Sequence, residues 1–237
     1  MVQSIDLIDS YPAVKHRIPV KFVTLFILGF LAVMLQLSGQ ENRYVFSHLN
    51  VNDGLSQNQI NCIYRDSKGF VWFGTNAGLN RFDGLSFEVF SEEKSENGSI
   101  KNSTINAIAE DRNGDLWIGT GNGVTVLNCK TYQFKEFDYR SLSPYSCGDI
   151  YYINALTADA EGNIWIGTNN GVFFYDTLRD KTERILVDET NCNSPLNSIM
   201  SIVHDHAGNI WMSTKNGFIA SYDPGMKKIE KFRIPGS

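Results

Sequence analysis

Two stretches of this chain decide its fold: INCIYRDSKGFVWFGTNAGLNRFD at residues 60–83 and INALTADAEGNIWIGTNNGVFFYD at residues 153–176. They align without a gap, and two close relatives of them occur elsewhere in the chain. The four copies are anchored on tryptophans that lie 45, 48 and 46 residues apart: Trp72, Trp117, Trp165 and Trp211. In every copy an Asp lies six residues before the Trp, a Gly three before it, a Thr three after it and a Gly six after it. This agreement defines an internal repeat of roughly 46 residues.

Each repeat is predicted to form short antiparallel strands joined by tight turns. The apolar segment 60–64 predicts a first strand, and the Asp-x-x-Gly at 66–69 predicts a turn, because Asp bonds its own backbone and Gly accepts positive φ. Segment 71–75 returns as a second strand with Trp72 in its middle, a flat group suited to packing between sheets. Corners such as Asn170-Gly171 favour a hairpin into a third strand. A fourth segment closes each unit, at 87–90, 134–137, 184–187 and 229–232.

A four-stranded sheet of this size cannot bury both of its faces alone, whereas radial stacking of several such sheets buries them. The sequence therefore predicts an all-β fold, a β-propeller of four-stranded antiparallel blades. Four blades are expected, at about 50–95, 96–140, 141–190 and 191–237.

One predicted strand has no blade of its own. Residues 44–49 align with the fourth strand of a blade, which gives five fourth strands for four sets of first to third strands. In a ring closed by strand exchange, an N-terminal strand completes the last blade. We therefore expect residues 41–237 to be part of an incomplete ring, the N-terminal blades of a longer protein. A complete four-bladed ring with a spare strand is the alternative.

The first 40 residues are different in kind. Three basic residues, Lys15, Arg17 and Lys21, precede an apolar run of 16 residues at 22–37, which is followed by small residues. This order is typical of a secretory signal. The run is short for a membrane span, which needs about 20 residues. We expect residues 1–40 to be a signal peptide cleaved near position 39 or 40, with an uncleaved signal anchor as the alternative, and we expect a periplasmic or other extracytoplasmic location.

Charge and cysteine content narrow the classes of function. The net charge of −5 and the lack of a Lys/Arg cluster argue against a nucleic-acid partner. The four cysteines show no metal-binding spacing: Cys62, Cys129, Cys147 and Cys192. We expect free thiols, because equivalent points on neighbouring blades lie farther apart than the ~5.5 Å Cα separation of a disulfide.

The repeat resembles that of the two-component regulator propeller family. The resemblance rests on FSHLNVNDGLSQNQINCIYRDSKGFVWFGTNAGLNRFDGLSFEVF at 46–90 and on LWIGTGNGV, IWIGTNNGV and IWMSTKNGF in the later copies, and it covers residues 44–234. The fourth copy departs from the pattern, with Ser213 where the others have Gly and one extra residue before Tyr222, which puts its local hairpin geometry in doubt.

The resemblance implies a function for the chain. Members of this family, typically from Bacteroidetes-type bacteria, are hybrid two-component sensors with periplasmic propellers of about seven blades. A membrane helix, a histidine kinase, a receiver and a DNA-binding domain usually follow, and the sensors signal as dimers. Many recognise oligosaccharides. The resemblance therefore implies an inner-membrane sensor whose ligand is an oligosaccharide, with this chain supplying propeller blades and no kinase.

The residues themselves give no support to catalysis. His204-Asp205-His206 could suggest a metal site, but Asp205 is the turn residue of the repeat and no third ligand is near it in the sequence. The other repeated Asp residues are turn formers that lie one to a blade. We expect no catalytic residues, no metal and no cofactor. The alternatives are a secreted propeller enzyme, such as a streptogramin-lyase-like or quinoprotein-like chain, and a non-catalytic interaction scaffold.

The long connection YRSLSPYSCGDIYY at 139–152 is the best candidate for ligand binding, because loops on a rigid scaffold often carry function. Its aromatic rings and polar groups suit the apolar faces and hydroxyls of a sugar. The predicted ligand-binding residues are Tyr139, Arg140, Tyr145, Asp149, Tyr151 and Tyr152. The alternative, that the tyrosines pack between blades, applies above all to the last two.

Overall fold

A computed structural model describes residues 46–93, 98–139 and 152–233, together with five positions nearer the N-terminus (Pro19, Lys21, Thr24, Leu25 and Phe26). The chain divides into two compact units, Met1–Ser47 and His48–Ser237. In the first unit Lys21 and the three residues from Thr24 are helical. None of the helices in the described part of the chain has both the length and the apolar character needed to span a bilayer. The predicted signal segment lies almost wholly outside the described residues.

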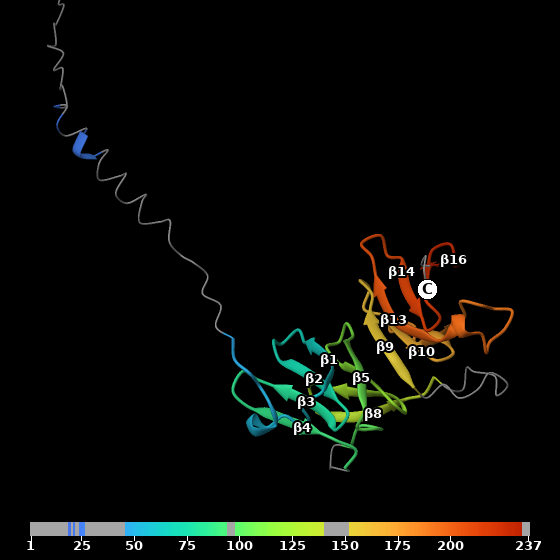
Figure 1. Ribbon diagram of the computed structural model, residues 1–237, viewed down its shortest axis with the longest axis horizontal. Coiled ribbons are helices and arrows are strands. Elements are labelled where there is room, and N and C mark those ends of the chain that lie inside the picture. The colour runs from blue at the N-terminus through green and yellow to red at the C-terminus, as the bar shows by residue number, and fades with distance from the viewer. Residues whose placement is uncertain are drawn as a thin grey trace, which may run out of the picture. The chain divides into compact units, whose positions relative to one another are not determined.

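The second unit consists of four sheets, each a four-stranded antiparallel meander (Figure 1). Blade 1 comprises β1 (Ile60–Arg65), β2 (Val71–Thr75), β3 (Gly78–Phe82) and β4 (Phe87–Phe90). Blade 2 comprises β5 (Ile105–Glu110), β6 (Leu116–Thr120), β7 (Gly123–Asn128) and β8 (Gln133–Phe137). Blade 3 comprises β9 (Ile153–Ala158), β10 (Ile164–Thr168), β11 (Gly171–Asp176) and β12 (Lys181–Ile185). Blade 4 comprises β13 (Ile199–His204), β14 (Ile210–Thr214), β15 (Phe218–Asp223) and β16 (Lys228–Arg233). The predicted all-β fold of four-stranded blades is confirmed.

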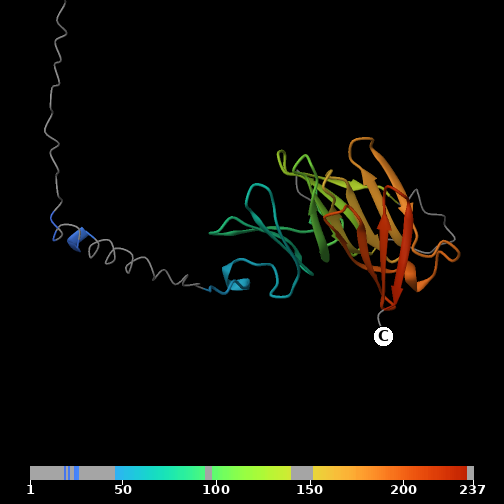
Figure 2. The ribbon, with the colours of Figure 1, turned by 90° about the horizontal axis from the view of Figure 1, so that it is seen from above.

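Successive blades pack face to face in chain order. The first strand of each blade contacts the first strand of the next, so β1, β5, β9 and β13 form the inner row of the array (Figures 1 and 2). Three apolar clusters fill the spaces between blades 1 and 2, 2 and 3, and 3 and 4. Each cluster contains the tryptophan of the earlier blade: Trp72, Trp117 or Trp165, with 1–3% of the residue surface exposed. The core of the second unit is therefore a series of three interfaces between blades.

The Asp of each repeat holds both a turn and a tryptophan. In blade 1, Oδ1 of Asp66 accepts hydrogen bonds from the backbone N–H groups of Lys68 and Phe70, at 3.0 and 2.9 Å. Its Oδ2 accepts the indole N–H of Trp72 at 2.8 Å. The other three blades repeat the indole bond at 2.9–3.0 Å, from Trp117 to Asp111, from Trp165 to Asp159 and from Trp211 to Asp205. The predicted turn role of the Asp is thus confirmed, and the carboxylate also fixes the ring that packs on the next blade.

A second turn precedes the outer strand of blades 2, 3 and 4. An Asn or Asp side chain accepts two backbone N–H groups, and four residues later a residue other than glycine has positive φ. Those left-handed residues are Tyr132, Asp180 and Lys227, each directly before the outer strand. The turn has the same length in all three blades, and in blade 3 it puts the outer strand at Lys181–Ile185 and not at the predicted 184–187. The predicted segment of blade 3 lies too late, because it starts eight residues after Asp176, whereas those of blades 2 and 4 start six residues after the equivalent Asn128 and Asp223.

The described residues from Phe46 to the start of β1 contain no strand. Residues 46–50 have no regular secondary structure, and a short 3-10 helix, η1 (Val51–Asp53), follows them. Phe46 is 88% exposed. Tyr44 and Val45 lie outside the described residues, so the strand expected at 44–49 stays a prediction.

Candidate functional site

The structure places two of the six predicted ligand-binding residues, and they differ in environment. Tyr139 is fully buried, with its ring 5.0 Å from that of Phe173 and 6.4 Å from that of Phe137, between blades 2 and 3. Tyr152 is 43% exposed and directly precedes β9. Arg140, Tyr145, Asp149 and Tyr151 lie outside the described residues. Ligand binding by the connection as a whole remains a prediction.

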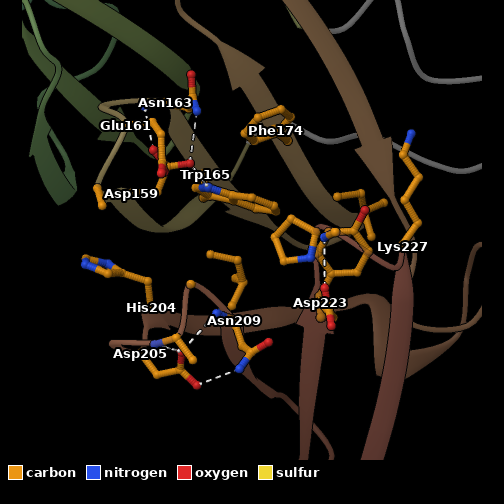
Figure 3. A pocket seen from close by; sticks show the side chains of 18 of the residues that line it. Asp159, Glu161, Asn163, Trp165, Phe174, His204, Asp205, Asn209, Asp223 and Lys227 are labelled. Atoms are coloured by element: carbon orange, nitrogen blue, oxygen red, sulfur yellow. Dashed lines mark hydrogen bonds between the residues drawn. The ribbon is translucent and has the colours of Figure 1, made fainter.

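A cleft of about 730 Å³ opens between blades 3 and 4, where the first turn of each blade and the last turn of blade 4 meet. Both walls come from the repeat, as Figure 3 shows. Blade 3 contributes Asp159, Glu161, Asn163, Trp165 and Phe174. Blade 4 contributes His204, Asp205, Asn209, Asp223 and Lys227. A volume of this size fits a small oligosaccharide or another drug-sized ligand.

The base of this cleft is aromatic and already packed. The Trp165 ring lies 4.6 Å from Phe174 and 5.8 Å from Tyr222, measured between ring centroids. Trp165 is only 2% exposed, because its ring faces are covered by these neighbours. The rings therefore give the cleft an apolar floor and leave little free ring face on which a sugar could stack.

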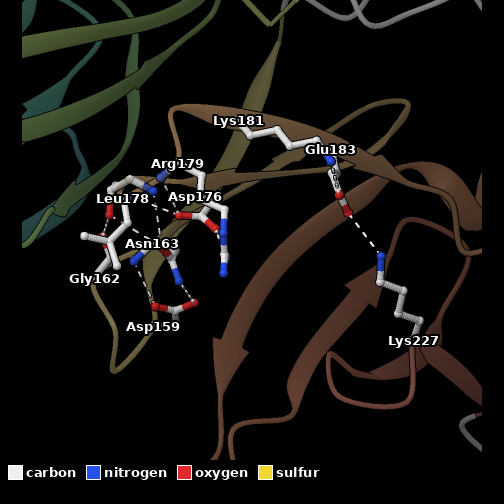
Figure 4. Close-up of polar contacts among 10 residues, drawn as sticks. Asp159, Gly162, Asn163, Asp176, Leu178, Arg179, Lys181, Glu183 and Lys227 are labelled. Atoms are coloured by element: carbon white, nitrogen blue, oxygen red, sulfur yellow. Dashed lines mark hydrogen bonds and ion pairs between the residues drawn. The ribbon is translucent and has the colours of Figure 1, made fainter.

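The rim of the cleft is charged and mainly acidic. Five carboxylates line it, at Asp159, Glu161, Glu183, Asp205 and Asp223, against one lysine and two histidines. The lysine, Lys227, lies across the cleft from blade 3, with Nζ 3.6 Å from Oε2 of Glu183 (Figure 4). Hydrogen bonding from Lys181, ahead of the other contributions, lowers the pKa of Glu183. This rim suits hydroxyl-rich or cationic ligands and disfavours anions.

His204, Asp205 and His206 line the cleft as part of a turn. Oδ1 of Asp205 accepts the backbone N–H groups of Ala207 and Asn209, both at 2.9 Å. Its Oδ2 accepts the indole N–H of Trp211 at 2.9 Å and the side-chain amide of Asn209 at 3.0 Å. Those two donors lower the pKa of Asp205 to about 2. The carboxylate is thus occupied by the turn, and no group of three or more metal-ligating side chains occurs among the described residues.

An equivalent cleft of about 690 Å³ lies between blades 2 and 3. It is lined by the corresponding Asp111 and Trp117, and by Tyr175 of the next blade. Burial and a hydrogen bond to Asp180 raise the pKa of Tyr175 to about 12. The two clefts share the Asp and Trp of the earlier blade, but the cleft between blades 2 and 3 is lined by β8 and not by the first turn of the following blade. Sequence analysis missed them, although the fixed spacing of Asp and Trp marks one wall of each.

The cysteines differ from expectation at one position. Cys62 and Cys129 are free, as expected, and burial raises their thiol pKa values to about 12 and about 11. Cys192, however, is disulfide-bonded, whereas a free thiol was expected; Cys147 lies outside the described residues. The expectation was based on the spacing of blades, but Cys192 lies in the connection between β12 and β13, whose path that spacing does not fix.

Comparison with known proteins gives a consistent set of relatives. Residues 54–77, 99–122, 148–170 and 193–216 match the two component regulator propeller family. Histidine kinase P4 of Formosa agariphila is 35% identical over 77 residues, which make up 32% of this chain and 6% of that protein.

Solved structures resemble the second unit as well. The extracellular domain of a putative hybrid two component system, BT3049 of B. thetaiotaomicron, has a TM-score of 0.69 at 24% identity, over 81% of this chain and 27% of that one. The corresponding domain of BT4673 has a TM-score of 0.64 at 20% identity, over 84% and 28%. Virginiamycin B lyase of Staphylococcus aureus has a TM-score of 0.58 at 17% identity, over 77% and 58%. At these identities the likeness shows the fold, and the chain spans little more than a quarter of the two sensor domains.

Proposed function

We propose that this chain, whose four repeats match the two component regulator propeller family, forms part of the extracytoplasmic ligand-sensing propeller of a hybrid two-component sensor. The observation that carries the proposal is the match of all four repeats to that family. The ligand is an oligosaccharide, and binding controls a histidine kinase that lies outside this chain. The sensor is a homodimer in the inner membrane.

Two features of the blades support binding over catalysis. The side chains that recur in every blade are engaged in holding turns and tryptophans, so they offer no free acid or base. The turns and connections, by contrast, differ between blades, and the rim clefts and the connection at 139–152 are found there. The likeness to virginiamycin B lyase is one of fold alone, so it gives no specific support to an enzyme.

The proposal can be tested by calorimetry of the full chain against a panel of neutral and acidic oligosaccharides and their constituent monosaccharides. We expect saturable binding of at least one oligosaccharide and a ligand-dependent rise in the melting temperature. Tyr152→Ala should weaken this binding, because Tyr152 is the exposed aromatic residue among those of the predicted connection that the structure describes.

A matched control is Leu178→Ala, which also removes an exposed apolar side chain. Leu178 is 74% exposed and lies in the turn after β11, at the end of blade 3 opposite to Tyr152. This substitution should leave affinity unchanged. A correctly folded chain that binds no member of the panel would overturn the oligosaccharide proposal. Chemical conversion of a bound sugar would overturn the non-catalytic part of it.

A further inference from the structure

Arg184 is a half-buried cation on the outer strand of blade 3. Its Nε and Nη2 donate to the carbonyl oxygen of Asn170 at 3.1 and 2.9 Å, and Nη2 also donates to Oδ1 of Asn170 at 2.6 Å. The central carbon of the guanidinium group lies over the Phe173 ring, 5.9 Å from its centroid. These contacts hold the guanidinium group beside the hairpin that joins β10 to β11.

The charge of Arg184 has no counter-ion within the part of the chain that the structure describes. By contrast Glu136, at the same register position of blade 2, forms an ion pair with Lys101 at 2.7 Å. Burial lowers the pKa of Arg184, and no nearby carboxylate acts against this effect. A guanidinium group has five N–H donors, and the two on Nη1 have no hydrogen-bond partner among the described residues. A partly desolvated cation of this kind favours an anionic partner.

The hairpin beside Arg184 does not need the arginine in order to form. Oγ1 of Thr168 closes it by accepting the backbone N–H of Asn170 at 3.0 Å. The equivalent threonines close the hairpins of blades 1 and 2 in the same way, at 2.9 and 3.0 Å, although those blades have Val89 and Glu136 at the position of Arg184. The hairpin of blade 4, whose geometry the sequence put in doubt, also pairs in register without an arginine. A purely structural role therefore does not account for this side chain.

Both described ends of the connection at 139–152 lie close to Arg184. At one end, the ring of Tyr139 lies 5.0 Å from that of Phe173, the ring that the guanidinium group covers. At the other end, Tyr152 directly precedes β9, whose first residue pairs with the last residue of β10, where the hairpin begins. Blades 2 and 3, which flank this position, each have a neighbouring blade on both faces. The position therefore does not belong to a face left open at an end of the array.

We propose that Arg184 binds an acidic group, a carboxylate or a sulfate, of the oligosaccharide that this chain recognises. The inference rests on the proposed function and names the chemical class of its ligand. Arginine suits such groups because its planar guanidinium directs several N–H donors at their oxygen atoms, and opposite charge strengthens each hydrogen bond. The acidic cleft between blades 3 and 4 lies at the opposite end of these blades, and its carboxylates disfavour the same ligand there.

The test is calorimetry of the full chain with pairs of oligosaccharides that differ only in charge. Each uronic acid oligosaccharide of the panel is paired with its methyl ester, and each sulfated one with its desulfated form. We expect an acidic member to bind, and its neutral counterpart to bind more weakly by roughly tenfold or more. The pair that shows this difference identifies the recognised group as a carboxylate or a sulfate.

Substitutions at Arg184 assign the charge effect to this residue. Arg184→Met keeps most of the length of the side chain and removes its charge. It should weaken binding of the acidic sugar by roughly tenfold or more and reduce the salt dependence of that binding, with little change for the neutral counterpart. Arg184→Lys keeps the charge without the planar fork and should give an intermediate affinity. The matched control is Lys231→Met at the same register position of blade 4, which should leave both affinities unchanged.

Near-ultraviolet circular dichroism and the melting temperature establish that each variant folds. If Arg184→Met does not fold, Arg184→Lys and the paired sugars carry the test. Equal or tighter binding of the neutral counterparts would overturn the role of Arg184 and leave the proposed function intact, and so would an Arg184→Met chain that keeps its preference for the acidic sugar. A folded chain that binds no oligosaccharide of the panel would overturn the proposed function, and this inference with it.

Discussion

At the scale of the residue, the Asp of each repeat does two tasks with two oxygens. One oxygen closes the turn before the second strand, and the other holds the indole of the tryptophan that packs on the next blade. The first task follows from the sequence, because Asp-x-x-Gly is a local turn signal. The second does not, because the orientation of a ring six residues away depends on how the two strands pair.

Asp205 should make the stability of the chain sensitive to acid. Its pKa is about 2 in the folded chain and roughly 3.9 when unfolded, so it stabilises the fold above pH ~4 and loses that contribution as the pH falls towards 2. Asp205→Asn should remove this pH-dependent contribution to the free energy of unfolding. Urea unfolding of both chains between neutral and acidic pH measures this contribution. If the free energies of unfolding of the two chains fell in parallel with pH, the role given to Asp205 would be contradicted.

The two free thiols should be inert in the folded chain. Burial raises the pKa of Cys62 to about 12 and that of Cys129 to about 11, so almost no thiolate forms near neutral pH. We expect iodoacetamide to leave both unmodified in the native chain and to modify both in guanidinium, as read by mass spectrometry of their peptides. Rapid native labelling of Cys62 would show that the interface between blades 1 and 2 opens.

At the scale of the element, most strands could be predicted from the sequence and the joints between blades could not. Hydrophobic alternation and Asn-Gly corners gave the strands of each blade because both signals are local. The asparagine and glycine contacts of Asn106 and Gly119 join residues more than thirty positions apart, so no local pattern reveals them. The outer strand of blade 3 begins directly after the left-handed Asp180, as those of blades 2 and 4 begin after Tyr132 and Lys227, so the prediction at 184–187 was placed too late.

Removing one of the asparagine hydrogen bonds between blades should lower the free energy of unfolding. Asn106→Ala leaves the carbonyl oxygen of Ile153 without its partner in a half-buried position, which costs about 1–3 kcal/mol. The matched control is Met200→Ala at the corresponding position of blade 4, which should change the free energy of unfolding by about 0.5 kcal/mol or less, typical of an exposed site. Urea unfolding measures both. Equal effects would mean that the asparagine contributes nothing as a donor.

At the scale of the whole molecule, the second unit behaves as a linear array in which the inner strand of each blade contacts the inner strand of the next. The candidate site belongs to this scale. Each rim cleft is built from two blades about 45 residues apart, so its existence follows from stacking and its lining from turn residues such as His204 and Lys227. The sequence-based prediction was instead the connection at 139–152 between blades 2 and 3, because its aromatic residues form a local run.

Local stability should vary along this array. In the described structure blades 2 and 3 are covered on both faces, and blades 1 and 4 on one. Under conditions where the chain is monomeric, we expect amides of β5 and β9 to exchange with deuterium more slowly than those of β1 and β13. Mass spectrometry of peptic peptides measures this. Uniform exchange across all four inner strands would indicate a single cooperative unit.

In blades 1 to 3 an asparagine of the inner strand donates a hydrogen bond to the first residue of the next inner strand, and this joint between blades has a consequence for how such chains grow. Each of these repeats carries both an isoleucine carbonyl that accepts this hydrogen bond and an asparagine amide that donates it. An unequal crossover that duplicates one repeat therefore delivers a blade that already fits its neighbours. Blades 1 to 3 are interchangeable parts in this sense. Blade 4 differs, because Met200 and Ser213 stand where the other blades have the asparagine and the glycine, so a copy of blade 4 would form neither of these contacts with a blade that follows it.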